Sequence, residues 1–370
     1  MKMLDLKART LLLSDGIKQH KAVVVYVFEN ENNNQYRYRY SNIEAAIRGS
    51  KKWVVVGFLT HELKMIEKYL EKVKIVVIVR QTGKKYGLIR MIRKMKKCGI
   101  KVLFDLDDLV FDYRYLGVLM ESVQEKSRLY WMGYIWGIRR IAKKVDGFIA
   151  TNDFLAKKLK KSFKKPCVVI PNSLNEEQLK VSEKCLREKE HDGFVIGYFS
   201  GSPTHLRDFK MVESELVKFL KKHDDVKFMM VGCMELSGQM KEMVKTGQVK
   251  VVGLVDYLKL QELMSKVDVN IAPLVINDFT NSKSELKFFE AAAVETTTIA
   301  SPTYTFSRAI SDGKDGLLAK FGEWYEKIDY LYNNPAINQK MAKSARNYVL
   351  ENYYGKNFIK QVEEAYELFG

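Results

Sequence analysis

The first half of the chain alternates short apolar runs with longer stretches of helical periodicity. Each run is apolar at successive positions, which predicts strands buried on both faces, as in a parallel sheet covered by helices. Helices are predicted at Ser41–Gly49, Glu62–Lys72 and Leu88–Cys98, with one longer helical region over Gly117–Lys144. The predicted strands are Ala22–Phe28, Trp53–Phe58, Ile75–Val79, Lys101–Asp105, Phe148–Thr151 and Val168–Ile170.

The same alternation restarts after a polar, charged stretch at Asn172–Gly193. Helices are predicted at Asp208–Lys222, Tyr257–Lys266 and Ser284–Ala293, and consecutive helices over Tyr325–Phe369. The predicted strands are Phe194–Phe199, Val226–Val231, Lys250–Val252, Val269–Ala272 and Thr297–Ala300. The sequence therefore predicts two doubly wound α/β domains in series, which bind ligands at the carboxyl ends of their strands in a shared cleft.

Four blocks stand out in the second half. In chain order they are PNSLN (Pro171–Asn175), VIGYFSGSPTHLRDFKMVESELVKFLKKHDDVKFMMVG (Val195–Gly232), DVNIAPLVINDFTNSKSELKFFEAAAVETTTIASP (Asp268–Pro302) and DGKDGLLA (Asp312–Ala319). In this order they resemble the donor domain of family 4 glycosyltransferases. The first half matches more loosely, through QYRYRYSN (Gln35–Asn42) and VLFDLDDLVFD (Val102–Asp112). The resemblance implies the GT-B fold of two Rossmann-like domains, with an acceptor-side domain at 1–175, a donor domain at 190–350 and a carboxyl-terminal helix at 355–370 crossing back to the first.

The glycine loop after the first strand of the second domain is the first candidate donor contact. A glycine such as Gly201 lets the backbone approach a phosphate, and the helix start that follows favours anions. The resemblance implies that Arg207 neutralises the diphosphate that leaves, the main electrostatic task in glycosyl transfer. Ser202 and His205 lie in the same loop and are candidate donor contacts.

The second donor signature runs through the helix at Ser284–Ala293. Ser284 is expected to cap this helix, with Lys283 beside its free amides. The resemblance implies that Glu290 accepts hydrogen bonds from the two ribose hydroxyls, a bidentate match to a vicinal diol. The family often carries another glutamate seven residues earlier, where this chain has Ser282, so donor-sugar recognition is expected to use Asn281 and backbone amides.

Acidic residues follow the fourth predicted strand of the first half. Asp105, Asp107 and Asp108 are expected to line the cleft, with loop capping as the structural alternative. Asp107 and Asp108 are the candidate general bases if the reaction inverts. On the acceptor side, Arg39 (or Arg37) is a candidate contact for an acceptor phosphate, and His61, after the second strand, is a further candidate.

The positive charge is concentrated in the first half. Residues 1–165 hold 36 Lys and Arg against 16 Asp and Glu, a net of +20, and the remainder holds 26 against 29, a net of −3. A field of this kind attracts phosphate-bearing ligands, anionic lipid headgroups or nucleic acid. Without an aromatic-basic nucleic-acid motif, we expect an anionic membrane surface rather than nucleic acid as the partner, with the basic helical regions Lys84–Lys97 and Arg139–Lys165 facing it.

Cysteine and histidine usage gives no metal or disulfide framework. The four cysteines (Cys98, Cys167, Cys185, Cys233) are widely spaced and the five histidines are scattered. We expect a reduced cytoplasmic protein, peripheral on the inner face of the plasma membrane, without a signal peptide, metal or cofactor. The Asp105–Asp107 pair resembles the metal-binding DxD of the other glycosyltransferase fold, which the second-half blocks oppose.

The expected function is transfer of a sugar from a nucleotide-sugar donor to a glycan or lipid-linked acceptor in surface polysaccharide biosynthesis. The resemblance implies retention at the anomeric carbon without a divalent metal. Three alternatives stay open: a non-catalytic nucleotide-sugar or glycan-binding protein, a sugar-nucleotide epimerase or phosphorylase of the same fold, and a nucleic-acid binder supported by charge alone.

Overall fold

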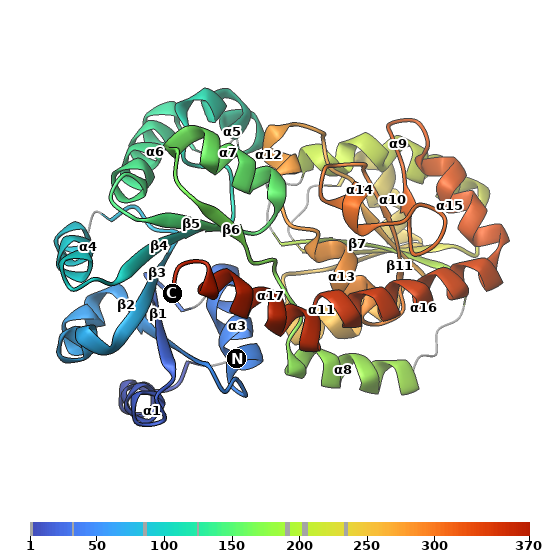
Figure 1. Cartoon of the computed structure of the whole chain (residues 1–370). Helices are drawn as coiled ribbons and strands as arrows, with labels where there is room; N and C mark the ends of the chain where they lie inside the picture. Colours follow the sequence, from blue (N-terminus) through green and yellow to red (C-terminus); the bar gives the residue numbers. More distant parts are fainter. Residues whose placement is uncertain are drawn as a thin grey trace. The chain divides into compact units, whose positions relative to one another are not determined.

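The protein is described here by a computed structural model, which covers residues 3–31, 33–83, 87–123, 126–188, 193–201, 206–232 and 236–370. The chain divides into two compact units (Figure 1). The first comprises Met1–Ser173, Ser282–Ser284 and Tyr353–Gly370, and the second comprises Leu174–Asn281 and Glu285–Asn352. The segment 176–189, left between the two domains by the sequence analysis, contains a helix of the second unit.

The first unit is built on a six-stranded parallel sheet with the order β2-β1-β3-β4-β5-β6. Its inner strands consist largely of Val, Ile and Phe, whose side chains are buried on both faces, because helices cover both sides of the sheet. The strands are β1 (Ala22–Phe28), β2 (Trp53–Leu59), β3 (Val73–Val79), β4 (Lys101–Leu106), β5 (Gly147–Ala150) and β6 (Cys167–Val169).

Right-handed crossovers decide which face each helix of the first unit covers. The connection from β1 to β2 runs one way along the sheet and carries α3, whereas those from β3 to β6 run the other way and carry α4, α6 and α7 on the opposite face (Figure 1). Helix α17 packs against α3, so the carboxyl-terminal helix belongs to the first unit, as predicted. The helices are α1 (Leu6–Lys18), α2 (Asn34–Tyr36), η1 (Arg37–Ser41), α3 (Asn42–Ile47), η2 (Thr60–Lys72), α4 (Leu88–Lys97), η3 (Tyr113–Tyr115), α5 (Leu116–Ser122), α6 (Arg128–Ala142), α7 (Asp153–Phe163) and α17 (Gly355–Glu367).

Two predicted helical stretches of the first unit take a different form. The stretch expected at Glu62–Lys72 is a 3₁₀ helix, η2. The long region expected over Gly117–Lys144 is two helices, α5 and α6. The second of these begins where the Ser127 hydroxyl accepts a hydrogen bond from the Tyr130 amide at 3.2 Å, an N-cap that starts a new helix.

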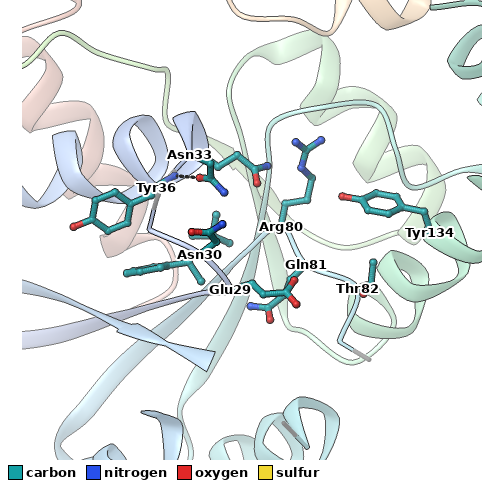
Figure 2. Close-up of a pocket in the computed structure, with 11 residues that line it drawn as sticks. Glu29, Asn30, Asn33, Tyr36, Arg80, Gln81, Thr82 and Tyr134 are labelled. Atoms are coloured by element: carbon teal, nitrogen blue, oxygen red, sulfur yellow. Dashed lines mark hydrogen bonds between the residues drawn. The ribbon is translucent and has the colours of Figure 1, made fainter. Parts of the chain in front are cut away.

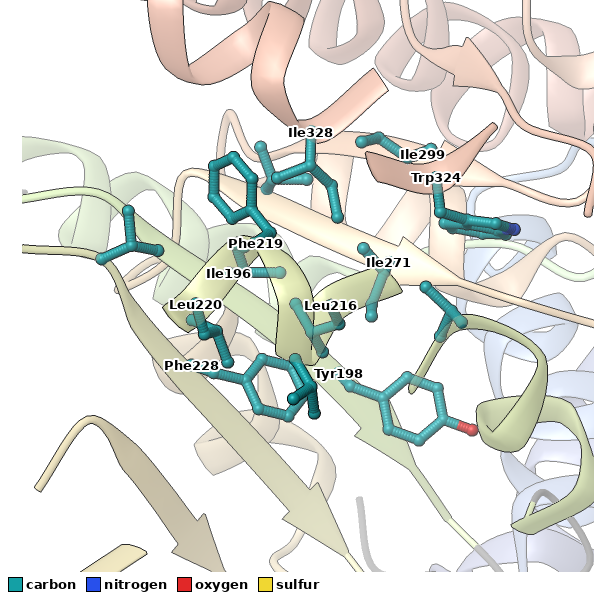
Figure 3. Close-up of a cluster of buried hydrophobic side chains, with 14 of the residues drawn as sticks. Ile196, Tyr198, Leu216, Phe219, Leu220, Phe228, Ile271, Ile299, Trp324 and Ile328 are labelled. Atoms are coloured by element: carbon teal, nitrogen blue, oxygen red, sulfur yellow. The ribbon is translucent and has the colours of Figure 1, made fainter. Parts of the chain in front are cut away.

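The second unit repeats the architecture with the strand order β12-β11-β10-β7-β8-β9. Neighbouring strands of this sheet pair in parallel. Its core joins the central strands to the inward faces of the helices, as Figure 3 shows for Phe219, Trp324 and their neighbours. The strands are β7 (Val195–Ser200), β8 (Lys227–Gly232), β9 (Val249–Val252), β10 (Val269–Ala272), β11 (Thr297–Ala300) and β12 (Leu317–Leu318).

The helices of the second unit include one that precedes its first strand. This helix, α8, begins at an asparagine cap, where the Asn175 side chain accepts from the Gln178 amide at 2.9 Å. The helices are α8 (Glu176–Arg187), α9 (Leu206–Lys222), α10 (Gly238–Lys245), α11 (Tyr257–Met264), α12 (Asp278–Asn281), α13 (Leu286–Ala292), α14 (Phe306–Ala309), α15 (Trp324–Asn333) and α16 (Pro335–Asn352).

Each sheet has one point where the direction of winding reverses. In the first unit this point lies between β1 and β3, because β2 is on one side of β1 and the later strands are on the other. In the second unit it lies between β7 and β10. Ligands of doubly wound sheets bind outside the carboxyl ends of the strands at such points. The fold therefore predicts one ligand-binding place in each unit, at the winding reversal of its sheet.

Candidate active site

Side chains from two loops meet at the winding reversal of the second unit. The Lys287 ammonium, in the first turn of α13, donates to the main-chain carbonyl of Phe199 in β7 and lies 4.6 Å from the centroid of the Tyr198 ring. The Asp208 carboxylate, in the first turn of α9, accepts from the Val275 amide after β10 at 2.9 Å. These bonds hold together the segments that follow β7 and β10.

Glu290 lies on α13 at 6% exposure and is supported by two glutamines. The Gln178 side-chain amide, from α8, donates to the Glu290 carboxylate at 3.3 Å. The Gln261 side chain, from α11, donates to the Glu290 main-chain carbonyl at 2.7 Å. A carboxylate held this way keeps its rotamer and still has oxygen lone pairs for further donors.

The other predicted donor residues are distributed as follows. Arg207 is exposed in the first turn of α9, and Gly201 is exposed directly after β7. Asn281 accepts from the Tyr304 amide at 2.8 Å, which ties α12 to the segment after β11. Ser202 and His205 lie outside the described residues.

The segment Ser282–Ser284 groups with the first unit. Ser282 is fully buried, and its carbonyl accepts from the Asn152 side chain at 2.8 Å. Lys283 is half-buried in this segment. The role of each predicted donor residue stays a prediction.

Ser284 does not cap the helix that follows it. The helix begins at Leu286, its N-cap is Glu285, and no side chain caps its amino end. The Ser284 hydroxyl is shielded from solvent and has no hydrogen-bond partner among the described residues. The expected cap is wrong because the turn after Lys283 extends two residues further before helical dihedral angles begin.

In the first unit, the predicted acids after β4 are engaged by one arginine. The Arg80 guanidinium pairs with Asp107 at 3.1 Å and with Asp108 at 2.6 Å, and the Gln35 amide donates to Asp107 at 2.9 Å. Burial alone lowers the pKa of Arg80, but the two carboxylates outweigh burial and raise it above its ordinary value. The single positive charge of Arg80 thus offsets one of the two carboxylate charges, and Gln35 adds a neutral hydrogen bond.

A cavity of about 470 Å³ opens at the winding reversal of the first unit. Figure 2 shows Tyr134, from α6, with its hydroxyl turned toward Arg80, and Asn30 and Asn33 near the start of α2. Burial raises the pKa of the Tyr134 phenol, so it remains a neutral hydrogen-bonding group. The lining residues are Phe28, Glu29, Asn30, Asn33, Gln35, Tyr36, Val79, Arg80, Gln81, Thr82 and Tyr134.

Arg39 does not reach this cavity. Its side chain is 1% exposed and forms a bidentate ion pair with Asp105, with Nη2 at 2.9 Å, and it also donates to the Ile170 carbonyl at 2.8 Å. Burial, the largest influence, raises the pKa of Asp105 to about 6. The expected contact of Arg39 with an acceptor phosphate is therefore corrected to a buried structural pair, and Asp105 lines no cavity described here.

The remaining acceptor-side candidates also lie apart from the cavity lining. Arg37 packs its guanidinium 4.2 Å from the centroid of the Tyr38 ring and donates to the Asn34 side chain at 3.5 Å. His61 is exposed at the start of η2, after β2. Neither residue lines the cavity between β1 and β3.

Three residues at the two winding reversals were not predicted from the sequence. Lys287 reads as an ordinary surface lysine, and Gln178 lies in a stretch that reads as a linker. An available signal for Gln178 was the asparagine cap and the acidic first turn of α8. Tyr134 belongs to an apolar helix whose sequence does not reveal which aromatic residue borders a cavity.

Residues 195–334 match the family model described as "Glycosyl transferases group 1". A glycosyltransferase domain therefore forms most of the second unit. This is the enzyme class predicted from the sequence, and the matched range contains Arg207, Lys283, Lys287 and Glu290. No curated protein matches the chain.

Solved structures share the fold over nearly the whole chain. HepE of Anabaena in complex with UDP is 12% identical, with a TM-score of 0.63 over 93% of this chain and 99% of that one. Sucrose-phosphate synthase of Thermosynechococcus elongatus is 15% identical, with a TM-score of 0.62 over 94% and 99%. A glycosyltransferase of Rickettsia africae is 16% identical, with a TM-score of 0.62 over 94% and 98%. The predicted fold, two Rossmann-like α/β domains of the GT-B type, is confirmed.

Within the described ranges, no group of three or more His, Cys, Asp or Glu side chains is arranged to hold a metal ion. No helix in the described part of the chain is long and apolar enough to cross a bilayer.

Proposed function

We propose that this protein transfers a sugar from a nucleoside-diphosphate sugar to a glycan or lipid-linked acceptor, with retention at the anomeric carbon and without a metal. The observation that carries the proposal is the winding reversal of the second unit, where Lys287 joins α13 to β7 and Asp208 joins α9 to the segment after β10. This place lies inside the range matched by the family model. It is also where doubly wound sheets bind nucleotides.

The donor half of the proposal assigns the residues by charge and geometry. Arg207 and Lys283 supply positive charge for the diphosphate, and Glu290 accepts from the ribose hydroxyls. Gly201, Ser202, His205, Asn281, Ser282 and Ser284 are retained as the proposed surroundings of the nucleotide sugar. HepE is solved with UDP-glucose, which makes uridine nucleotides the first donors to test.

The acceptor half rests on the cavity of the first unit. Its lining is rich in amides and tyrosine. Its two charged residues are the acidic Glu29 and Arg80, which is paired with Asp107 and Asp108, so no unpaired arginine of the lining is offered to a phosphate. Amide and phenol groups recognise hydroxyl groups, and an aromatic face packs against a sugar ring. We therefore propose a neutral sugar as the acceptor moiety in this cavity, rather than a phosphate.

The proposed reaction breaks the bond between the anomeric carbon and the diphosphate and forms a bond from that carbon to an acceptor oxygen. The acceptor proton passes to the leaving phosphate oxygen, and the nucleoside diphosphate departs. Arg207 and Lys283 stabilise the charge that develops on the leaving group, which is the chief contribution of the protein. Asp107 and Asp108 are the proposed general bases only if the product proves to be inverted.

The basic first half supports a place for this enzyme in surface polysaccharide biosynthesis, at the inner face of the plasma membrane. Acceptors of that kind are carried on lipids, and clustered Lys and Arg residues favour an anionic surface by about 1 kcal/mol each. Exposed cations lie on α4 and α7, including Arg93, Lys97, Lys157 and Lys161.

A thermal-shift screen against UDP-, GDP-, dTDP- and CMP-linked sugars tests the proposal first. We expect one nucleotide class to raise the melting temperature, and the same donor to be consumed with a sugar acceptor, giving a product with the donor's anomeric configuration. Binding without any transfer favours a non-catalytic nucleotide-sugar-binding protein. The reason to consider this alternative is Ser282, a buried serine where the family often has a glutamate. Epimerised donor without an acceptor favours an epimerase, and no stabilisation by any of the four contradicts the proposal.

A further inference from the structure

Helix α6 has apolar side chains on two opposite faces, although it lies at the surface. Its inner face follows helical spacing through Trp131, Ile135, Ile138 and Ala142, all of which are buried. A surface helix of a globular protein is normally polar on its other face. On α6 the other face is apolar as well, which packing within the first unit does not explain.

The outer face carries a continuous row that we call the α6 stripe: Leu129, Met132 and Trp136, followed by Arg140. The spacing of three, four and four residues places them on one side of a helix. Leu129 is 80% exposed, Met132 42% and Trp136 51%. Exposed large apolar side chains gathered on one side of a helix are typical of an interaction surface.

Positive charge surrounds the α6 stripe. From Lys126 to Val145 the sequence contains six Lys and Arg residues and no Asp or Glu. The Arg140 guanidinium lies 4.6 Å from the centroid of the Trp136 ring, and the Lys126 ammonium lies 5.5 Å from that of Tyr130. Because these cations pack on exposed aromatic rings, apolar surface and positive charge lie side by side on this helix.

The neighbouring helices extend this charge over the same face of the sheet. The β3-to-β6 crossovers put α4, α6 and α7 together on one side of the first unit (Figure 1). Exposed basic side chains on α4 and α7 include Arg90, Arg93, Lys97 and Lys161. An apolar, aromatic row within a basic field is the composition of a helix that lies in the interface of an anionic bilayer.

We propose that the α6 stripe is the surface by which this protein docks on an anionic lipid bilayer, with Leu129, Met132 and Trp136 inserted among the headgroups. Charge complementarity selects lipid over a second copy of the chain, because two such faces would oppose like charges. The inference deepens the proposed function and rests on it for the acceptor.

Tyr134, which lines the cavity, belongs to the same helix and stacks with the exposed Tyr130, with ring centroids 6.0 Å apart. Docking would thus bring the cavity to the surface that carries a lipid-linked acceptor.

The chain provides its own optical reporter for this proposal. Of its four tryptophans, Trp53, Trp131 and Trp324 are buried, and Trp136 is exposed. The purified chain is mixed with phosphatidylcholine vesicles with or without phosphatidylglycerol, and binding is measured by sedimentation and by tryptophan emission. We expect binding and a blue shift of the emission with the anionic vesicles, and weak binding to the neutral ones.

Variants separate the stripe from general charge attraction. Leu129→Ser combined with Met132→Ser should weaken binding to anionic vesicles by at least about tenfold, because two inserted apolar side chains are lost. Trp136→Phe should bind nearly as the wild type but lose the blue shift. Phe321→Ser, at a position 77% exposed in the second unit, is the matched control and should change neither readout.

Three results would overturn the docking surface: no preference of the wild type for anionic vesicles, a double-serine variant that binds as the wild type does, or a blue shift that persists in Trp136→Phe. A wild-type dimer in light scattering that the double-serine variant dissociates would assign the stripe to a second copy instead, which also overturns the proposal. Calorimetry with UDP in the double-serine variant keeps this test distinct from the proposed function. Vesicle binding without nucleotide binding would contradict the transferase function and support the docking surface. Nucleotide binding without vesicle binding would support the transferase function and contradict the docking surface.

Discussion

The two units use the carboxyl ends of their parallel strands in different ways. In the first unit, charged side chains there pair with one another, as in Arg39 with Asp105 and Arg80 with Asp107 and Asp108. In the second unit, Lys287 and Asp208 bond to main-chain groups at the ends of neighbouring strands. The first arrangement pairs charges within the unit and borders a cavity lined mostly by neutral side chains, with Glu29 and Arg80 as its charged residues. The second ties the segments after neighbouring strands to one another. Under the proposed function, the first unit is the acceptor side and the second unit is the donor side.

The largest expected effect is on stability, at the buried pair of the first unit. Arg39→Met should lower the free energy of unfolding by about 3–5 kcal/mol, because it leaves the Asp105 carboxylate buried without its partner. Denaturant unfolding measures the loss, and donor binding should be retained wherever the variant is folded. Combining Arg39→Met with Asp105→Leu should recover much of the loss. A cost below about 1 kcal/mol for Arg39→Met would contradict the structural assignment.

The next effect belongs to the donor side and should appear in turnover rather than stability. Arg207→Ala or Lys283→Ala should each lower the rate of transfer on the order of 10²-fold, as expected for the loss of one group that stabilises the leaving charge. Initial rates at saturating donor provide the measurement. Lys245→Ala, an exposed cation paired with Glu242 on α10, is the matched control and should be neutral. Wild-type turnover in both test variants would refute the roles given to these cations.

A smaller effect is expected from the acceptor side. Tyr134→Ala should raise the acceptor KM about tenfold, equivalent to about 1.4 kcal/mol, and leave the donor dissociation constant unchanged. Steady-state kinetics with the acceptor varied gives the first value, and calorimetry gives the second. Tyr330→Ala, at an exposed tyrosine of the second unit, serves as the control. Weaker donor binding with an unchanged acceptor KM would contradict this assignment, because it would place the donor rather than the acceptor in the first unit.

The smallest effect concerns an ion pair at the edge of the first unit. Hydrogen bonds from Arg114 and Ser162 outweigh burial and lower the pKa of Asp112 to about 2. Because the folded pKa is depressed, the stabilisation is present above the unfolded pKa of about 4 and is lost as pH falls toward 2. Asp112→Asn should therefore cost about 1 kcal/mol at neutral pH, allowing for solvent screening, and nothing near pH 2. An equal cost at both values would contradict this.

Much of the fold could be predicted because the strands are buried on both faces. Ala22–Phe28, Val269–Ala272 and Thr297–Ala300 have the predicted bounds in the structure, since a continuous apolar run admits few other placements. Caps and short helices were harder. The cap expected at Ser284 is wrong, and α8 was not predicted. Caps are formed by hydroxyl and amide side chains whose hydrogen bonds depend on the local turn, and hydrophobic periodicity contains no information on that turn.

The sequence indicated the apolar surroundings of Glu290 but not the burial of Arg39. Glu290 stood out because apolar neighbours surround it on a helix, and the structure shows it buried and held by Gln178. Arg39 was expected to contact an acceptor phosphate, because it lies in the first βα connection. In the run Tyr36–Tyr40, a π-helix turns the residues so that Arg39 enters the core beside the packed rings of Tyr36 and Tyr40. Sequence periodicity does not anticipate that change of helical pitch.

The most direct test of the central claim is a calorimetric titration of UDP into the wild type, Glu290→Gln and Glu262→Gln. Glutamine at position 290 keeps the size of the side chain and an oxygen for Gln178, and removes the charge offered to the ribose hydroxyls. Glu262 is a half-exposed carboxylate of α11 in the same unit and serves as the control. We predict saturable binding to the wild type, binding at least about tenfold weaker to Glu290→Gln, and wild-type affinity in Glu262→Gln. Equal affinity of all three proteins, or no binding of UDP, GDP or dTDP to the wild type, would contradict a nucleotide site on the second unit.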